Sequence, residues 1–309
     1  MARAPVAVLG IFVADLAFRA PRLPLMGETI LGQGFKDGPG GKGSNQAIAA
    51  ARAGGDARMI TRIGRDTFGE MAQKAWAADG IDTSAVVIDE TAPTGAAFIF
   101  VSTETGNNAI IVESGAAAHL SPDDVAAAEA VIASSRVLIT QFEQPTVTAL
   151  AGLTMARKHG VITILNPAPA VEVTDAIYGL CDYVTPNETE ASALTGLPVV
   201  TEDDALAAAK EFVRRGAKNA LITLGGKGAL LHGEAGTHMV PAFKVPRVVE
   251  TTGAGDAFNG GFAVALAEGK SPVEAIRFGC ATAGISVQRP GTAPSMPTRA
   301  EIEALLASG

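Results

Sequence analysis

Residues 250–260 read Glu-Thr-Thr-Gly-Ala-Gly-Asp-Ala-Phe-Asn-Gly and run directly into an alanine-rich helical stretch. The small residues at 253–255 allow a tight turn that leaves successive N–H groups free, and the following helix adds the positive end of its dipole. This pattern predicts an anion pocket suited to phosphate. A carboxylate at its mouth, Asp256, suits a base that deprotonates a hydroxyl attacking a phosphoryl group. The alternative is a plain glycine turn with Asp256 as the N-cap of the helix.

A second glycine cluster occupies residues 38–45, Gly-Pro-Gly-Gly-Lys-Gly-Ser-Asn, and literally contains the dinucleotide-binding pattern G-x-G-x-x-G. That pattern should follow the first strand directly, but about 25 residues intervene here and Pro39 lies inside the turn. A nicotinamide dehydrogenase is therefore the weaker interpretation. A Walker A loop is disfavoured because Lys42 is followed by Gly43 rather than by Ser or Thr.

The same cluster suits a bare backbone against which a flat polyhydroxylated ligand can lie. Lys42 and Asn45 would then supply hydrogen bonds. The structural alternative is a simple helix start capped by Ser44.

Composition narrows the class of protein. The chain has 309 residues, 48% of them apolar, and a net charge of −8, which disfavours nucleic acid or an anionic membrane as a partner. Its two cysteines, Cys181 and Cys280, give no disulfide framework. Because the sequence shows no leader pattern and no apolar run of membrane-spanning length, we expect a cytoplasmic enzyme. The spacing of the histidines indicates no metal site; they are His119, His159, His232 and His238.

Short apolar runs alternate with helical patterns, which predicts an α/β fold: a Rossmann-like, mostly parallel sheet with helices on both faces. The predicted strands are Val6–Phe12, Arg58–Ile63, Val137–Gln141, Ile162–Asn166, Tyr183–Pro186 and Ala220–Leu224. The predicted helices are Ser44–Ala53, Gly69–Asp79, Asp123–Ala133, Val147–Lys158, Thr189–Leu194 and Asp203–Arg215.

Two regions break this rhythm and are predicted to form a small antiparallel β-sheet lid, residues 14–37 and 94–113. The α/β domain then comprises residues 1–13, 38–93 and 114–309. Residues 227–240 are expected to add antiparallel strands at the edge of the main sheet.

Five segments in this order resemble the ribokinase-like carbohydrate kinase family over essentially the whole chain. They are residues 40–47, 165–169, 185–190, 222–228 and 251–258. The resemblance implies a Rossmann-like domain whose β-sheet lid often mediates dimerisation, so a homodimer through the lid is expected.

The resemblance also implies roles for individual residues. Asp256 would be the base for the primary hydroxyl of a sugar, and the N–H groups of Gly253, Ala254 and Gly255 would form the anion hole. The sugar-binding positions are Val13, Asp15, Gly41, Lys42, Gly43, Asn45, Glu143 and Asp256. The nucleotide-binding positions are Asn187, Thr223, Gly225, Gly226, Lys227, Gly228, Gly255 and Cys280.

Two metal sites are implied as well. Asn187 and Glu190 match an N-x-x-E motif that positions Mg²⁺ through its waters; from sequence alone they are also a helix cap with a capping box. The positions implied to bind K⁺ are Glu250, Thr252, Ser286, Arg289, Gly291 and Ser295.

Two positions depart from the family pattern. Glu250 stands where the cation-site acid is commonly Asp, which places K⁺ dependence in question. Val13 stands where an asparagine contacts the sugar, which places the identity of the sugar in question.

The resemblance, added to the two glycine motifs, implies an ATP-dependent kinase for the C5 hydroxyl of a pentose, with D-ribose first, using ATP, Mg²⁺ and K⁺. A kinase for 2-deoxyribose, a keto sugar or a nucleoside remains an alternative within the class. The alternatives outside it are a dehydrogenase and a non-catalytic sugar sensor, and the presence of Asp256 disfavours the sensor.

Overall fold

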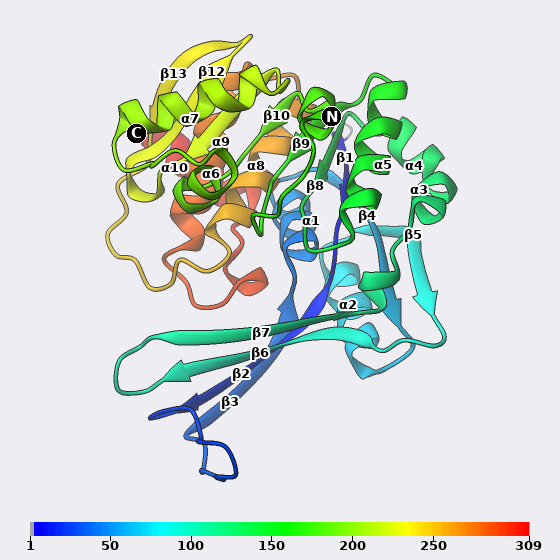
Figure 1. Ribbon diagram of the computed structural model, residues 1–309, viewed down its shortest axis with the longest axis vertical. Coiled ribbons are helices and arrows are strands. Elements are labelled where there is room, and N and C mark those ends of the chain that lie inside the picture. Colours follow the sequence, from blue (N-terminus) through cyan, green and yellow to red (C-terminus); the bar gives the residue numbers. More distant parts are fainter. Residues whose placement is uncertain (1–2, 309) are drawn as a thin grey trace.

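The computed structural model describes residues 3–308, so residues 1–2 and 309 of the predicted α/β domain lie outside it. A nine-stranded sheet runs in the order β13-β12-β11-β10-β9-β8-β1-β4-β5 (Figure 1). All its neighbouring strands are parallel except β11–β12 and β12–β13, which are antiparallel as predicted for this edge. Its strands are β1 Pro5–Leu9, β4 Asp56–Gly64, β5 Asp82–Asp89, β8 Val137–Thr140, β9 Ile162–Leu165, β10 Tyr183–Val184, β11 Asn219–Thr223, β12 Gly228–Gly233 and β13 Gly236–Pro241.

Helices cover both faces of this sheet because its central strands are apolar on both. In β1, Val6 and Val8 join one core cluster while Ala7 and Leu9 join the other, since alternate side chains of a strand point to opposite faces. The first cluster lies under α1 Lys42–Arg52, α2 Thr67–Ala78, α8 Ala254–Ala267, α9 Pro272–Ser286 and α10 Arg299–Ser308. The second lies under α3 Pro122–Ala127, α4 Glu129–Ala133, α5 Thr146–Lys158, α6 Glu188–Thr195 and α7 Glu202–Arg214.

A small four-stranded sheet projects from this body, in the order β3-β2-β6-β7 (Figure 1). Its strands are β2 Val13–Ala20, β3 Gly34–Gly40, β6 Thr94–Ser102 and β7 Asn108–Gly115. The expected separate sheet is confirmed. Its outer pairings are antiparallel as predicted, but the central β2–β6 pairing is parallel, because each hairpin contributes its inner strand in the same direction.

Other elements also differ from the prediction, and helices α9 and α10 were not predicted. Strand β5 was not predicted, since it is an edge strand whose first residues are exposed and polar. The helix predicted over residues 123–133 is divided at Ala128, whose N–H is shared between the carbonyls of Asp124 and Val125. Both cysteines are free and buried. No helix formed by residues 3–308 has the length and apolar character needed to cross a membrane.

Candidate active site

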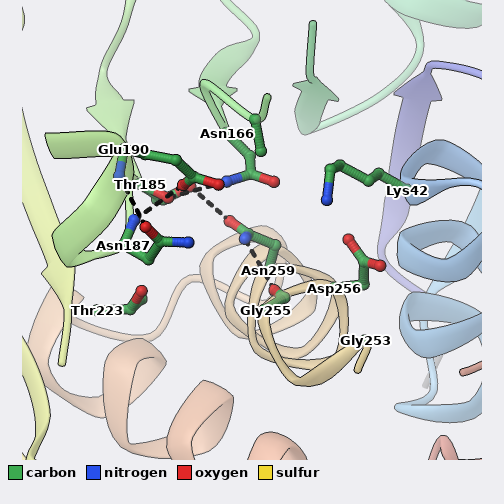
Figure 2. Close-up of a pocket in the computed structure, with 11 residues that line it drawn as sticks. Lys42, Asn166, Thr185, Asn187, Glu190, Thr223, Gly253, Gly255, Asp256 and Asn259 are labelled. Carbon is green, nitrogen blue, oxygen red and sulfur yellow. Dashed lines mark hydrogen bonds between the residues drawn. The ribbon is translucent and has the colours of Figure 1, made fainter. Parts of the chain in front are cut away.

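A pocket of about 130 Å³ opens where the parallel strands of the main sheet end and α8 begins (Figure 2). Strands β9, β10 and β11 deliver polar side chains there, which is the usual place for a ligand in an open parallel sheet. The pocket is lined by Lys42, Asn166, Ala168, Thr185, Asn187, Glu190, Thr223, Gly253, Gly255, Asp256 and Asn259.

The N-terminus of α8 forms one wall of this pocket. Gly253 is the N-cap and has φ of 79°, a left-handed conformation that favours glycine. A Cβ atom placed on Gly255 would meet no heavy atom within 4 Å, so space lies open in front of this residue. The N–H of Ala254 donates to the carbonyl of Thr251 at 3.1 Å, whereas within residues 3–308 the N–H groups of Gly253 and Gly255 have no acceptor. The start of α8 therefore presents free N–H groups and a dipole to an anion.

Asp256 lies in the first turn of α8 and is 6% exposed. Its Oδ2 accepts a hydrogen bond from Asn45 Nδ2 and its Oδ1 accepts one from Gln46 Nε2, both at 3.0 Å. The interpretation of Asp256 as a simple N-cap is therefore wrong, because Gly253 holds that position. Burial raises the pKa of the Asp256 carboxyl, and the Lys42 charge and the two amides act in the opposite direction.

The N-terminus of α1 brings the second glycine cluster to the same place. Gly41, with φ of 85°, is the N-cap, and a Cβ on it would lie 2.7 Å from the carbonyl of Ile11. Gly43 is packed equally closely, on the backbone of Gly10. The alternative that Ser44 caps this helix is wrong: its hydroxyl instead accepts a hydrogen bond from Trp76 Nε1 at 3.0 Å.

The predicted sugar-binding side chains surround the end of α1. Glu143 follows β8, and its Oε2 accepts a hydrogen bond from the backbone N–H of Lys42 at 2.8 Å. The Oδ1 of Asn45 is buried and has no partner within residues 3–308, as expected for an acceptor reserved for a ligand hydroxyl. Desolvation raises the pKa of Glu143 to about 7 and that of Asp15 to about 6. Burial alone would lower the pKa of Lys42, but the neighbouring carboxylates raise it overall.

Val13 lies two residues before Asp15 on β2, so both side chains share one face of the small sheet. Val13 is 3% exposed and packs with Ile11, Ala97 and Ala117. The side chain that was predicted to meet the sugar is therefore almost completely buried in a small apolar cluster, and it is not among the residues that line the pocket.

The predicted magnesium and nucleotide residues divide into two groups. Asn187 caps α6 and forms a capping box with Glu190, as predicted, and both side chains line the pocket together with Thr223. Figure 2 shows these three side chains facing Lys42 and Asp256 from the opposite side. Burial raises the pKa of Glu190.

Of the other predicted nucleotide residues, Gly255 lines the pocket at the start of α8, whereas Gly225, Gly226, Lys227, Gly228 and Cys280 are not among its lining residues. Gly225, Gly226 and Lys227 form an exposed turn, and Lys227 Nζ donates to the carbonyl of Val200 at 3.2 Å. Gly228 begins β12 with φ of 115°. Cys280 belongs to α9 and is buried in the core, and burial raises the pKa of its thiol to about 12.

Hydrogen bonds join some of the predicted potassium residues, which lie in the segments before α8 and at or after the end of α9. Glu250 Oε2 accepts a hydrogen bond from the N–H of Gly291 at 2.7 Å, and the N–H of Glu250 donates to the carbonyl of Val287. Ser286 precedes that carbonyl, and the Ser295 hydroxyl donates to the carbonyl of Thr292. Thr252 is exposed next to Gly253, while the side chain of Arg289 is engaged with Glu301.

Sequence reasoning assigned no role to four residues that the structure places at the pocket or against Asp256: Gln46, Asn166, Thr185 and Asn259. They connect the side-chain carboxylate of Asp256 to the backbone carbonyl of Gly255 through hydrogen bonds. A signal was present for three of them. Asn166 and Thr185 lie at the carboxyl ends of the predicted buried strands Ile162–Asn166 and Tyr183–Pro186, and Gln46 directly follows the glycine cluster of residues 38–45.

Comparison with known proteins places the whole chain in one family. Residues 3–299 match the family model described as pfkB family carbohydrate kinase. The ribokinase of Haemophilus influenzae is 43% identical over 97% of both chains, and the deoxyribokinase of Salmonella typhi is 37% identical over 95% of both. The structure of Arabidopsis thaliana ribokinase complexed with ribose and ATP covers 99% of each chain at 32% identity, with a TM-score of 0.93.

Proposed function

Because this chain belongs to the pfkB family of carbohydrate kinases, we propose that it transfers the γ-phosphoryl group of ATP to the primary C5 hydroxyl of D-ribose. The observation that carries this proposal is the position of Asp256, a buried carboxylate beside the open N-terminus of α8. Phosphoryl transfer uses a base for the attacking hydroxyl and groups that bind the transferred phosphoryl. A carboxylate and a helix N-terminus that lie side by side support both roles.

In this proposal the sugar lies between α1 and the small sheet, and ATP approaches from the side of Thr223 and Asn187. The oxygen of the C5 hydroxyl attacks the γ-phosphorus, and Asp256 accepts the proton of that hydroxyl. The bond from that phosphorus to the bridging oxygen breaks, and ADP leaves. The free N–H groups of Gly253 and Gly255 stabilise the negative charge on the transferred group.

The higher identity to a ribokinase, 43% against 37% for a deoxyribokinase, supports D-ribose as the first candidate, whereas Val13 supports 2-deoxyribose. An isopropyl group cannot form a hydrogen bond with a sugar hydroxyl, so this position favours a sugar that presents hydrogen there. The deoxyribokinase among the relatives makes 2-deoxyribose the second candidate substrate.

The chemistry of the donors fits Mg²⁺ and a monovalent cation. Asn187 and Glu190 offer hard oxygen ligands at the pocket edge, where they would hold Mg²⁺ through its waters. Glu250 and the carbonyls around Ser286, Arg289 and Ser295 would hold K⁺. Bound there, such cations would neutralise charge on the phosphates and strengthen the anion hole.

We further propose that the small sheet is a lid over the sugar and the interface of a homodimer. Phe18, Phe35 and Phe98 form an aromatic cluster on it, with ring centroids 4.9 and 5.7 Å from Phe18. These three residues are 36–59% exposed. An exposed apolar cluster of this kind marks an interaction site, and in this proposal a second copy of the sheet covers it. Light scattering of the wild type and of Phe18→Ser tests this: a monomeric wild type contradicts it.

The function itself is tested by measuring ADP release with a panel of pentoses, deoxypentoses, hexoses, keto sugars and nucleosides. Phosphorylation of ribose or 2-deoxyribose well above the others supports the proposal. No ADP release with any sugar, together with binding of a nicotinamide cofactor, would overturn it.

A further inference from the structure

A chain of buried side-chain amides passes behind Asp256. Gln141 Nε2 donates to Gln46 Oε1, and Gln46 Nε2 donates both to Asp256 Oδ1 at 3.0 Å and to Asn166 Oδ1 at 3.1 Å. Asn166 Nδ2 in turn donates to the backbone carbonyl of Thr185 at 2.9 Å. The amide side chains of this chain are almost completely buried, so water does not compete for their hydrogen bonds.

The backbone carbonyl of Thr185, the last acceptor in this row of amides, determines how each amide side chain is oriented. A backbone carbonyl can only accept, so Asn166 must direct its NH₂ group to Thr185 and its oxygen to Gln46. Gln46 must then direct its NH₂ group to Asn166, and the second hydrogen of that group is directed to Asp256. Gln141 completes the arrangement by donating to the remaining oxygen of Gln46.

The same chain continues to the anion-binding end of α8. The hydroxyl of Thr185 donates to Asn259 Oδ1 at 2.7 Å, and Asn259 Nδ2 donates to the carbonyl of Gly255 at 2.9 Å (Figure 2). One hydrogen-bonded network therefore connects the carboxylate to the loop that would receive the phosphoryl group.

We propose that Gln46 is a positioning residue that holds Asp256 in its ionised form and fixes the direction of its free lone pairs. The inference rests on the proposed kinase function. Gln46 itself reaches neither sugar nor nucleotide, because both ends of its amide are occupied by protein groups. Its hydrogen bond to Oδ1 and that of Asn45 to Oδ2 leave the remaining lone pairs of the carboxylate directed at the pocket.

The charges that face Asp256 make such donors necessary. Lys42 on α1 favours the ionised carboxylate, while Asp15 on β2, Glu143 after β8 and Glu190 on α6 oppose it. Burial opposes it as well. An amide that can only donate to Asp256 shifts this balance toward the ionised base at neutral pH.

The test is the pH dependence of the single-turnover rate of sugar phosphorylation, with saturating ATP and sugar. Gln46→Met keeps the volume and removes the donor. Loss of one hydrogen bond to a charged group should move the acidic limb of the rate profile upward by about 1–2 pH units. The KM values for sugar and ATP should change less than about threefold, and the rate should recover at high pH.

A matched control is Gln144→Met. Gln144 is as buried as Gln46 but donates to Thr140 and to the carbonyl of Gln141, away from Asp256. This variant should keep the wild-type profile. If Gln46→Met does not fold, Gln46→Glu retains the shape and places a second carboxylate against Asp256; the pair then shares a proton and the acidic limb moves upward further.

The outcomes separate the two proposals. A wild type that phosphorylates no sugar contradicts the kinase function. An active wild type whose acidic limb is unmoved in both Gln46 variants overturns the role of Gln46 alone, as does an equal shift in Gln144→Met.

Discussion

The open space in front of Gly255 allows a substitution that separates folding from catalysis. In Gly255→Ala the new methyl group meets no protein atom within 4 Å, so the structure offers no steric cost. Alanine also has the higher helix propensity, and the free energy of unfolding should be unchanged or rise by up to about 1 kcal/mol.

The same methyl group lies where the transferred phosphoryl group is proposed to bind. A carbon atom keeps its neighbours at about 3.5–4.0 Å, whereas an anion-hole N–H requires its oxygen at about 2.7–3.1 Å. The oxygen is therefore displaced from its donor. Loss of one such donor reduces kcat by about 10²–10³-fold, or about 2.7–4 kcal/mol of transition-state stabilisation.

The assay is kcat from ADP release, measured beside a thermal or denaturant unfolding curve. Gly284→Ala in α9 is the control, since its Cβ would make only ordinary contacts of 3.5–3.9 Å away from the pocket. It should keep full activity. If Gly255→Ala retained more than about a tenth of wild-type kcat, the phosphoryl group would not bind at this end of α8.

Four further outcomes are expected. Asp256→Asn should lose about 10²–10⁴-fold in kcat while ATP affinity is nearly intact, and retention of a tenth of the activity would exclude it as the base. Val13→Asn should shift the kcat/KM ratio toward ribose over 2-deoxyribose by about 5- to 100-fold; an unchanged ratio would make Val13 a core residue only. Potassium should raise activity through a site that includes Glu250, whereas equal rates with and without potassium at matched ionic strength would contradict that site. The pKa of Glu143 is raised to about 7 by burial, so the folded protein binds more protons than the unfolded chain above pH 4.5 and loses stability as pH rises. Glu143→Gln should accordingly raise the free energy of unfolding at pH 8 by about 1–3 kcal/mol and have little effect at pH 4; equal effects at both would refute the linkage.

Much of the main domain was predictable because its signals are local. Apolar runs of strand length and helical periodicity identified six of the parallel strands, and turn residues marked the small sheet. Strand β5 was missed because an edge strand buries little, and the parallel β2–β6 pairing depends on how two distant hairpins meet. A local sequence pattern predicts neither the presence of this edge strand nor the direction of this pairing.

The site shows the same division. Glycine clusters reveal backbone geometry, so the ends of α1 and α8 could be predicted as binding elements. The amide network could not, because Gln46 and Asn166 are 120 positions apart and become partners only through packing. Cys280 lies in the core and away from the described pocket, so its contact with a nucleotide stays a prediction.

Strand β3 of the small sheet is joined to α1 by a single residue, Gly41. If the small sheet acts as the proposed lid, its tilt would therefore move the turn of α1 that carries Asn45, which donates a hydrogen bond to Asp256. A bound sugar that closes the small sheet over the pocket would also orient Asp256 through Asn45. A water molecule is too small to cause this closure. The direct connection of β3 to α1 should consequently suppress hydrolysis of ATP in the absence of sugar.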